Sequence, residues 1–362
     1  MSGFARLTAP ACGLILAALA AGQAEAQFYA GKTITTVVNY GAGGNADIQA
    51  RIFVKFLPKY IKGNPVFIIQ NTPGAGGMTA MNLLGQKVGG LKNDGMSLGY
   101  FTFNGMAPLI GDPALKVKMS DFDFISGIGG WNVAYARKEV LKDPAKPASI
   151  AGVTGIFAGG YSPQSSHDTR IRMSLDMMKA QYKIVTGFPD ASAVNKAILQ
   201  GELNMSVSSL PGWASIVQPQ LIQPGIAVAL WQYPVSGPNG TYEGNPLLAK
   251  IGIRTFTDVY KEAYGKYPEG PLFDAFLLVN NLSTKVERIV VMPAGSPKAA
   301  VEEMQHAFAE TGKDKEFIAE WMKVIKDPPE LTPPAEGEEL FASLAHVKPE
   351  VTATLKKAAL VE

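Results

Sequence analysis

The sequence predicts an α/β protein of two lobes, in which each lobe is a mostly parallel sheet flanked by helices and a ligand cleft lies between the lobes. Two observations predict this fold. Runs of β-branched residues alternate with apolar residues at helical spacing between residues 33 and 101, and the alternation returns between residues 153 and 232. The chain of 362 residues is also long enough for two domains.

The first lobe begins with two repeats of strand, glycine-rich turn and helix. The predicted elements are a strand at 33–39, a helix at 47–57, a strand at 65–70, a helix at 77–88 and a strand at 97–101. Pro58 disturbs the end of the first helix. In sheets of this kind, ligands bind beyond the carboxyl ends of the strands.

The second lobe repeats this pattern, and the C-terminal third of the chain completes the first lobe. Strands are expected at 153–158, 182–185, 203–207, 225–232 and 287–292, helices at 169–180, 193–199, 296–311, 315–324, 337–347 and 349–358, and loops at 237–245 and 326–334. We therefore expect residues 27–132 and 229–362 to form lobe 1, and residues 133–228 to form lobe 2.

The N-terminus has the pattern of a secretory signal peptide. Residues 1–26 combine a basic residue, Arg6, an apolar centre over 12–21 and a small-residue ending, so cleavage is expected after Ala26. A membrane anchor is the alternative, but the apolar run is shorter than the roughly 20 residues that a span needs. The sequence therefore predicts that the protein is exported.

The composition excludes several classes of function. There are 33 Lys and Arg residues against 31 Asp and Glu, a net charge of +2, and no basic stripe, so no nucleic-acid partner is expected. The only cysteine, Cys12, falls inside the predicted signal peptide, so the mature chain has no thiolate for a metal site. The three histidines lie far apart without metal-ligand spacing. We expect no metal and no cofactor.

The two glycine-rich turns give the strongest functional signal. They read A-G-G-N-A-D over 42–47 and Q-N-T-P-G-A-G-G-M over 70–78, and each opens a helix whose free N–H groups suit an anion. The first turn satisfies G-x-G-x-x-A, but the second strand lacks the terminal acidic residue that binds a ribose, so no dinucleotide is expected. The turns contain no Arg or Lys, so N–H groups, hydroxyls and water are expected to hold a small carboxylate or phosphate without ion pairs.

Several polar side chains near predicted strand ends have two interpretations. Asp47 and Asp190 each stand near a helix start, where a carboxylate either stabilises its own helix, the favoured reading, or orients a ligand. Ser165 and Ser166 are expected to bind ligand or to cap the next helix. The adjacent His167 raises the alternative of a serine hydrolase, which is disfavoured because neither serine stands in a G-x-S-x-G elbow.

The chain resembles the extracytoplasmic solute receptors of tripartite tricarboxylate transporters, which are the Bug- or TctC-type binding proteins. The family's P-x-x-P-G-G-x-x-D occurs at residues 39–47, with Asn39 and Ala42 in place of both prolines, and N-x-P-G-A-G-G is intact at residues 71–77. The further matches are D-G at 94–95, P-A-G-S-P at 293–297 and, more loosely, residues 158–166 and 185–192. The resemblance covers essentially all of the mature chain.

The resemblance implies a two-lobed periplasmic binding protein fold, type II-like, without enzymatic activity. It implies a monomer that closes on a small carboxylate, such as a di- or tricarboxylate or an aromatic acid, and delivers it to membrane transporter subunits. The alternatives are a receptor for a neutral or amine-bearing ligand, a sensory partner of a membrane kinase, and an exported hydrolase using Ser166 and His167.

The turns, the predicted strand ends and the resemblance together define the candidate ligand-binding residues. Most aromatic side chains near strand ends are expected in the core, and a few are expected to line the cleft. The candidates are Tyr40, Gly41, Ala42, Gly43, Gly44, Asn45, Asp47, Thr72, Gly74, Ala75, Gly76, Gly77, Met78, Phe103, Tyr161, Ser165, Ser166, Phe188, Asp190, Ala191, Ser192 and Ser208.

Overall fold

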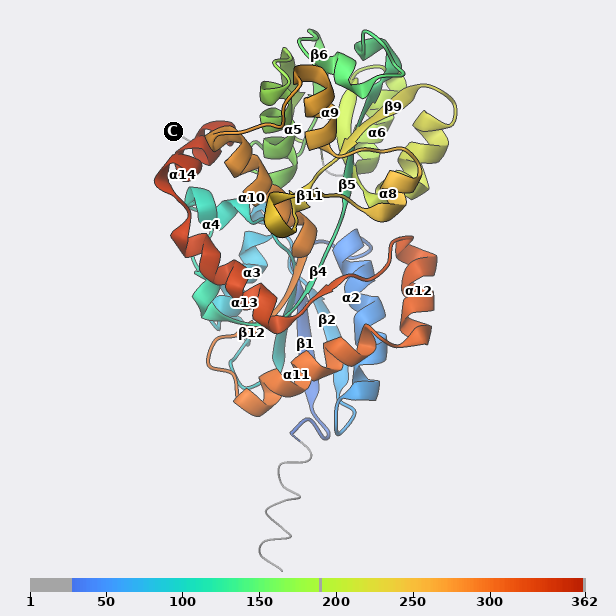
Figure 1. The fold of residues 1–362 in the computed structure, drawn as a ribbon. Coiled ribbons are helices and arrows are strands. Elements are labelled where there is room, and N and C mark those ends of the chain that lie inside the picture. The colour runs from blue at the N-terminus through green and yellow to red at the C-terminus, as the bar shows by residue number, and fades with distance from the viewer. Residues whose placement is uncertain (1–27, 189–190, 361–362) are drawn as a thin grey trace, which may run out of the picture.

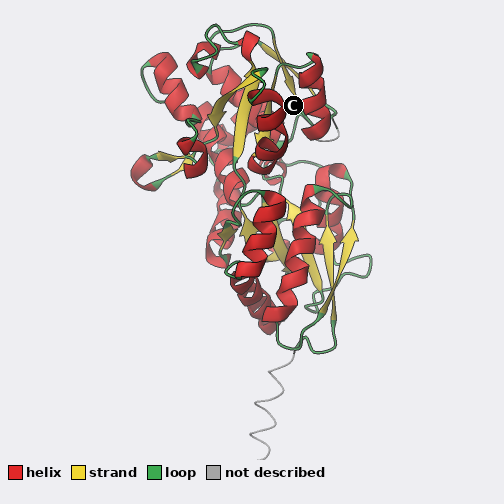
Figure 2. Cartoon of the chain, turned by 90° about the vertical axis from the view of Figure 1, so that its right-hand side faces the viewer, coloured by secondary structure: helices red, strands yellow, loops and turns green. Residues whose placement is uncertain are grey.

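The computed structural model describes residues 28–188 and 191–360, so the predicted signal peptide and Asp190 lie outside the described residues. Two lobes, each with a sheet covered by helices, lie one above the other in Figure 1 and in the perpendicular view of Figure 2. The predicted α/β architecture of two lobes is confirmed. In the described part of the chain, no helix has both the length and the apolar character that a membrane span requires.

The first sheet has six strands in the order β13-β4-β12-β3-β1-β2. Its strands are β1 (Thr33–Val38), β2 (Val66–Asn71), β3 (Ser97–Thr102), β4 (Phe122–Ile128), β12 (Arg288–Pro293) and β13 (Leu331–Thr332). β1 pairs in parallel with β2 and β3, whereas β12 lies antiparallel between β3 and β4.

The second sheet has five strands in the order β7-β6-β8-β5-β9. Its strands are β5 (Asn132–Arg137), β6 (Ile156–Gly159), β7 (Tyr182–Val185), β8 (Met205–Ser209) and β9 (Ala227–Gln232). β6 is parallel to β7 and β8, but β5 is antiparallel to β8 and β9. Both sheets are therefore mixed, which corrects the predicted mostly parallel sheets. The reason is that β5 and β12 each lie antiparallel to both of their neighbours. These are the strands at which the chain enters the second sheet and returns to the first.

Helices cover both faces of the first sheet because alternate residues of its strands point to opposite faces. One face packs against α2 (Asn45–Phe56), α11 (Lys298–Thr311) and α12 (Lys315–Ile325), and the other against α3 (Met78–Gly85) and α13 (Pro334–Ser343). Phe53 lies at the centre of the first group, with ring centroids 5.0 Å from Phe308 and 4.7 Å from Phe317. This aromatic cluster fixes the helix that follows the first glycine-rich turn.

The second sheet is covered in the same way. One face packs against α5 (Ser166–Met177), α9 (Phe256–Tyr264), α10 (Pro271–Lys285) and α14 (Pro349–Ala358), and the other against α6 (Ala191–Gln200) and the π-helix η7 (Trp213–Ile222). Shorter elements are α4 (Met106–Ile110), α7 (Leu210–Gly212), α8 (Pro246–Lys250), η2 (Leu57–Tyr60), η3 (Ala75–Gly77), η4 (Met119–Asp121), η5 (Lys138–Val140), η6 (Pro147–Ile150), η8 (Pro238–Gly240), η9 (Leu344–His346), β10 (Val235–Ser236) and β11 (Tyr242–Glu243).

Two predicted loops contain short strands. The segment 237–245 contributes β11 to a two-stranded ribbon with β10, and the segment 326–334 contributes β13 to the first sheet. The predicted lobe boundaries stay a prediction. The strands change sheet between β4 and β5 and again between β9 and β12, and α9 packs on β9 of the second sheet.

The chain crosses from the first sheet to the second at Gly129 and Gly130. The N–H of Gly129 donates to the carbonyl of Glu330, and the N–H of Gly130 donates to the carbonyl of Thr284, both at 2.8 Å. A side chain at Gly130 would collide with the side chain of Glu287. The outgoing crossing therefore lies directly beside the segment that returns the chain to the first sheet.

Candidate functional site

A cavity of about 1160 Å³ lies between the two lobes. Its wall in the first lobe comes from the two glycine-rich turns and the residues after β3, and its wall in the second lobe comes from the start of α5 and the end of β8. Because strand ends of both sheets meet here, the cavity lies where α/β proteins bind ligands.

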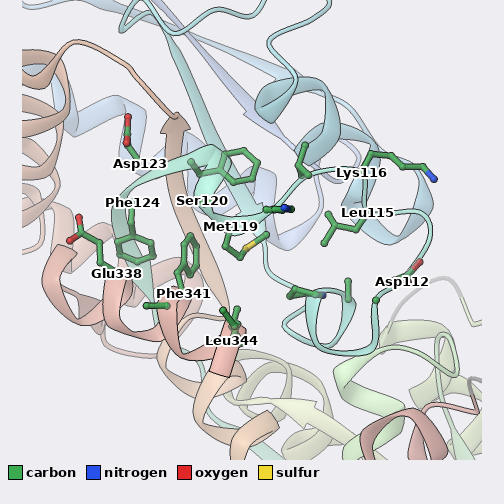
Figure 3. Close-up of a pocket in the computed structure, with 18 of the residues that line it drawn as sticks. Asp112, Leu115, Lys116, Met119, Ser120, Asp123, Phe124, Glu338, Phe341 and Leu344 are labelled. Atoms are coloured by element: carbon green, nitrogen blue, oxygen red, sulfur yellow. The ribbon is translucent and has the colours of Figure 1, made fainter. Parts of the chain in front are cut away.

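A second cavity, of about 820 Å³, lies in the first lobe between residues 107–124 and α13. Figure 3 shows the side chains of Met119, Phe124 and Phe341 lying toward one another in this space. Neither glycine-rich turn contributes to its wall. The interlobe cavity is therefore the candidate ligand site.

Asp47 holds the first glycine-rich turn against the second. Its carboxylate is almost fully buried and accepts hydrogen bonds from the N–H of Gly43 (2.8 Å), Nε of Arg51 (2.9 Å) and Nδ2 of Asn71 (3.0 Å). Nδ2 of Asn71 also donates to the carbonyl of Tyr40 at 2.9 Å. Burial acts to raise the pKa of Asp47, but these hydrogen bonds together lower it below its usual value.

The second turn is shaped by glycines that adopt positive φ. Gly74, Gly76 and Gly77 have φ of 137°, 63° and 95°, which L side chains rarely adopt. Asn39, at the position of a family proline, accepts from the N–H of Thr102 (2.9 Å), and its Nδ2 donates to the carbonyls of Thr102 (3.0 Å) and Gly77 (3.4 Å). Asn39 therefore cross-links the second turn to β3.

The start of α2 is open toward the cavity, whereas the start of α3 is not. In the described residues, no side chain caps the N-terminus of either helix, although Asp47 occupies the N–H of Gly43 just before α2. The first N–H groups of a helix have no partner within the helix. At α3, however, the N–H of Met78 donates to the carbonyl of Ala75 and the N–H of Thr79 donates to the carbonyl of Gly74. The first N–H groups of α2 are therefore the ones available to an anion in the cavity.

The structure brings most of the predicted site residues together. Fourteen line the interlobe cavity: Tyr40, Gly41, Ala42, Gly44, Asn45, Ala75, Gly76, Met78, Phe103, Tyr161, Ser165, Ser166, Ala191 and Ser208. The other described candidates lie outside its lining: Gly43, Asp47, Thr72, Gly74, Gly77, Phe188 and Ser192. Phe188 packs instead against the core of α6 and η7.

The start of α5 forms the wall of the cavity in the second lobe. Oγ of Ser165 caps the helix by accepting from the N–H of Asp168 at 3.1 Å. The carboxylate of Asp168 is fully buried and accepts from the N–H of Tyr161 at 2.9 Å. Oγ of Ser166 lies 3.2 Å from Oδ1 of Asn104, which follows β3, so this hydrogen bond joins the two lobes.

The arrangement does not favour the hydrolase alternative. The ring nitrogens of His167 lie 3.1 Å from Oδ1 of Asp168 and 3.2 Å from the carbonyl of Val207, and its ring packs on Tyr161. Ser166 is hydrogen-bonded to Asn104 and not to His167. A serine nucleophile needs a base within hydrogen-bond reach of its hydroxyl, which His167 does not provide here.

Two arginines line the cavity, which corrects the expectation of a site without ion-pairing groups. Arg170 comes from α5 and Arg288 from β12, and each is 4% exposed. Nη1 of Arg288 lies 3.0 Å from Oε1 of Glu287, which also lines the cavity. The glycine-rich turns themselves contain no Arg or Lys, whereas these charges come from a helix and a strand, at positions 118 residues apart in the chain. The alternation of charged and apolar residues at the start of α5 is the only local signal for Arg170.

No protein-family model matches the sequence, and no curated protein matches it significantly. Solved structures, however, are similar over almost the whole chain. A TctC solute-binding protein from Polaromonas is 16% identical, with a TM-score of 0.62 and coverage of 90% of this chain and 97% of that one. MatC from Rhodopseudomonas palustris, solved with malate, is 16% identical, with a TM-score of 0.60 and coverage of 91% and 99%.

A further protein from Rhodopseudomonas palustris, solved with adipate, is 15% identical, with a TM-score of 0.62 and coverage of 91% of this chain and 98% of that one. At these identities the similarity shows the fold. The chain therefore has the fold of the TctC- and Bug-type solute-binding proteins.

Proposed function

We propose that this protein is a periplasmic receptor that captures a small organic carboxylate in the interlobe cavity and delivers it to a tripartite tricarboxylate-type membrane transporter. The observation that carries the proposal is that two glycine-rich turns, separated in sequence, line one cavity together with the start of α5 from the other lobe. Both turns open helices that no described side chain caps. The solved relatives of this fold that contain malate and adipate support a carboxylate as the ligand.

The available donors are sufficient for useful affinity. A hydrogen bond to a charged group contributes about 1.5–3 kcal/mol. Three or four such bonds from N–H groups and hydroxyls of the cavity wall would give micromolar binding, which corresponds to about −8 kcal/mol. Because the wall comes from both lobes, a ligand that touches both stabilises the closed arrangement.

The predicted signal peptide and the fold support export to the periplasm, where a monomer would bind ligand and then dock on the membrane subunits. The sensory alternative uses the same binding step, so the genes beside this one separate the two roles. A transporter role predicts neighbouring genes for two membrane subunits, and a sensory role predicts a neighbouring membrane kinase.

Isothermal titration of the mature protein with mono-, di- and tricarboxylic and aromatic acids tests the binding step. We expect one class to bind with stoichiometry near one and to raise the melting temperature by mass action. If no acid produces heat or a thermal shift, the carboxylate proposal is wrong.

The Gly76→Val variant tests whether the turns form the site. A Cβ at Gly76 would have only Cε of Met78 nearby, at 3.9 Å, so a valine there would project into open space at the cavity wall. Gly89→Val is the matched control, because Gly89 has a similar φ (67° against 63°) with nothing within 4 Å and does not line the cavity. We expect at least about a tenfold loss of affinity in the first variant only. Equal affinities would remove the second turn from the site.

A further inference from the structure

Arg170 is a buried cation on the wall of the interlobe cavity. Its side chain projects from α5, one turn after Ser166, and is 4% exposed. Nε donates to the carbonyl of Ser166 at 3.2 Å, and the guanidinium lies 4.8 Å from the ring centre of Tyr233. Nη1 is buried and has no hydrogen-bond acceptor among the described residues.

Nothing in the described part of the chain neutralises this charge directly. No carboxylate oxygen there lies within the 4.0 Å of an ion pair with Arg170. Glu287 is the nearby acid that favours its charge electrostatically, but Oε1 of Glu287 pairs with Nη1 of Arg288 at 3.0 Å. Asp112, the other acid of the cavity wall, accepts from the N–H of Ala114.

An unpaired guanidinium is costly to bury, since it loses its hydration without gaining a counter-ion. Burial lowers the pKa of Arg170, while Tyr233 and Glu287 act in the opposite direction. A core position of this kind would normally hold an apolar residue or a paired one. The arrangement gains most when an anion enters the cavity and accepts from the free N–H groups.

We propose that Arg170 binds a second carboxylate of the ligand, so that the receptor selects a dicarboxylate over a monocarboxylate. This inference rests on the proposed function, in which the first carboxylate occupies the glycine-rich turns of the first lobe. The planar guanidinium presents paired N–H donors that match the two oxygens of a carboxylate. Since Arg170 belongs to the second lobe, a dicarboxylate would bridge the lobes and favour their closure.

The test compares each dicarboxylate with its own monoamide, which has the same length and one charge fewer. Succinate, glutarate, adipate and terephthalate, each with its monoamide, are titrated into the wild-type protein by calorimetry. We expect the best dicarboxylate to bind at least about tenfold more tightly than its monoamide, because a charge-assisted bond is lost in the amide.

Variants on α5 assign this preference to Arg170. In Arg170→Met the ratio of the two affinities is expected to fall to about one, while the monoamide keeps its affinity. Arg170→Lys keeps the positive charge but lacks the paired N–H donors of the guanidinium, so it is expected to give an intermediate ratio of the two affinities. Arg172→Lys is the matched control, because Arg172 is buried on the same helix but donates to the carbonyls of Pro163 and Ala358 and does not line the cavity.

The outcomes separate the inference from the proposed function. Equal affinity of dicarboxylate and monoamide in the wild type, or a preference that survives in Arg170→Met, overturns the inference and leaves the carboxylate receptor standing. Absence of binding by every acid and every amide overturns the proposed function and the inference with it. If Arg170→Met does not fold, Arg170→Lys and the wild-type comparison still decide the question.

Discussion

The Asp47→Asn variant tests whether this buried carboxylate holds the two glycine-rich turns together. Asp47 accepts from the N–H of Gly43 and from Nδ2 of Asn71 on opposite oxygens, at 2.8 and 3.0 Å. An amide has only one acceptor oxygen, so keeping the bond to Gly43 turns its NH₂ group toward the donor of Asn71. Asn71 could present its own oxygen instead only by losing its bond to the carbonyl of Tyr40.

The cost follows from these contacts. A hydrogen bond to a charged group is worth about 1.5–3 kcal/mol and a neutral one about 0.5–1.5 kcal/mol, so losing one and weakening another costs about 2–4 kcal/mol. The side chain of Arg51 is 55% exposed, so its ion pair with Asp47 adds less than about 1 kcal/mol. For a lobe of this size the melting temperature should fall by roughly 5–10 °C.

Thermal unfolding followed by circular dichroism at pH 7, together with calorimetric titration of the bound acid, measures both effects. Hydrogen bonding lowers the pKa of Asp47 in the folded state, so its stabilisation is present above its unfolded pKa and is lost as the pH falls through the folded pKa. The difference between wild type and variant should therefore shrink below about pH 4. Arg51→Ala is the control with a small expected loss. If Asp47→Asn leaves both the melting temperature and the affinity unchanged, the carboxylate of Asp47 does not hold the two turns together.

Two further predictions concern the contact between the lobes and the acidic residues near the crossing. Ser166→Ala removes the hydrogen bond to Asn104 and should weaken ligand binding by about 0.5–1.5 kcal/mol in a calorimetric titration, whereas unchanged affinity would leave Ser166 without a role in closure. Burial, followed by the charges of Glu330 and Glu287, raises the pKa of Asp327 to about 7, so stability should fall by about 2–3 kcal/mol as the pH rises from 4 through 7. Asp327→Asn should abolish that fall, and a melting temperature that still drops between pH 5 and pH 8 would contradict the assignment.

Elements with strong local signals could be predicted from the sequence. The helix at 47–57 corresponds to α2, and the strand at 33–39 corresponds to β1, because each shows the periodicity of its own secondary structure. The glycine-rich turns were also identified correctly, since positive φ at Gly74, Gly76 and Gly77 is a local requirement that the sequence displays.

Elements whose role depends on distant pairing could not be predicted in this way. β4 and β5 received no assignment, and β4 owes its place to antiparallel pairing with β12, for example between Ile128 and Arg288. The mixed direction of both sheets follows from where the chain crosses between lobes. No local pattern records that crossing, because it depends on contacts such as the bond from Gly130 to Thr284.

The α/β class, the two turns and the helices that they open are predictable from sequence, because propensity, periodicity and glycine content act over a few neighbouring residues. Which charged side chains line the cavity depends on the tertiary structure. Arg170 and Arg288 reach one cavity from different lobes. Asp47, which the sequence left between two roles, is directed away from the cavity lining and into the bonds that hold the turns. Electrostatic pairing depends on distance in space, and that distance is set by packing between segments far apart in the chain.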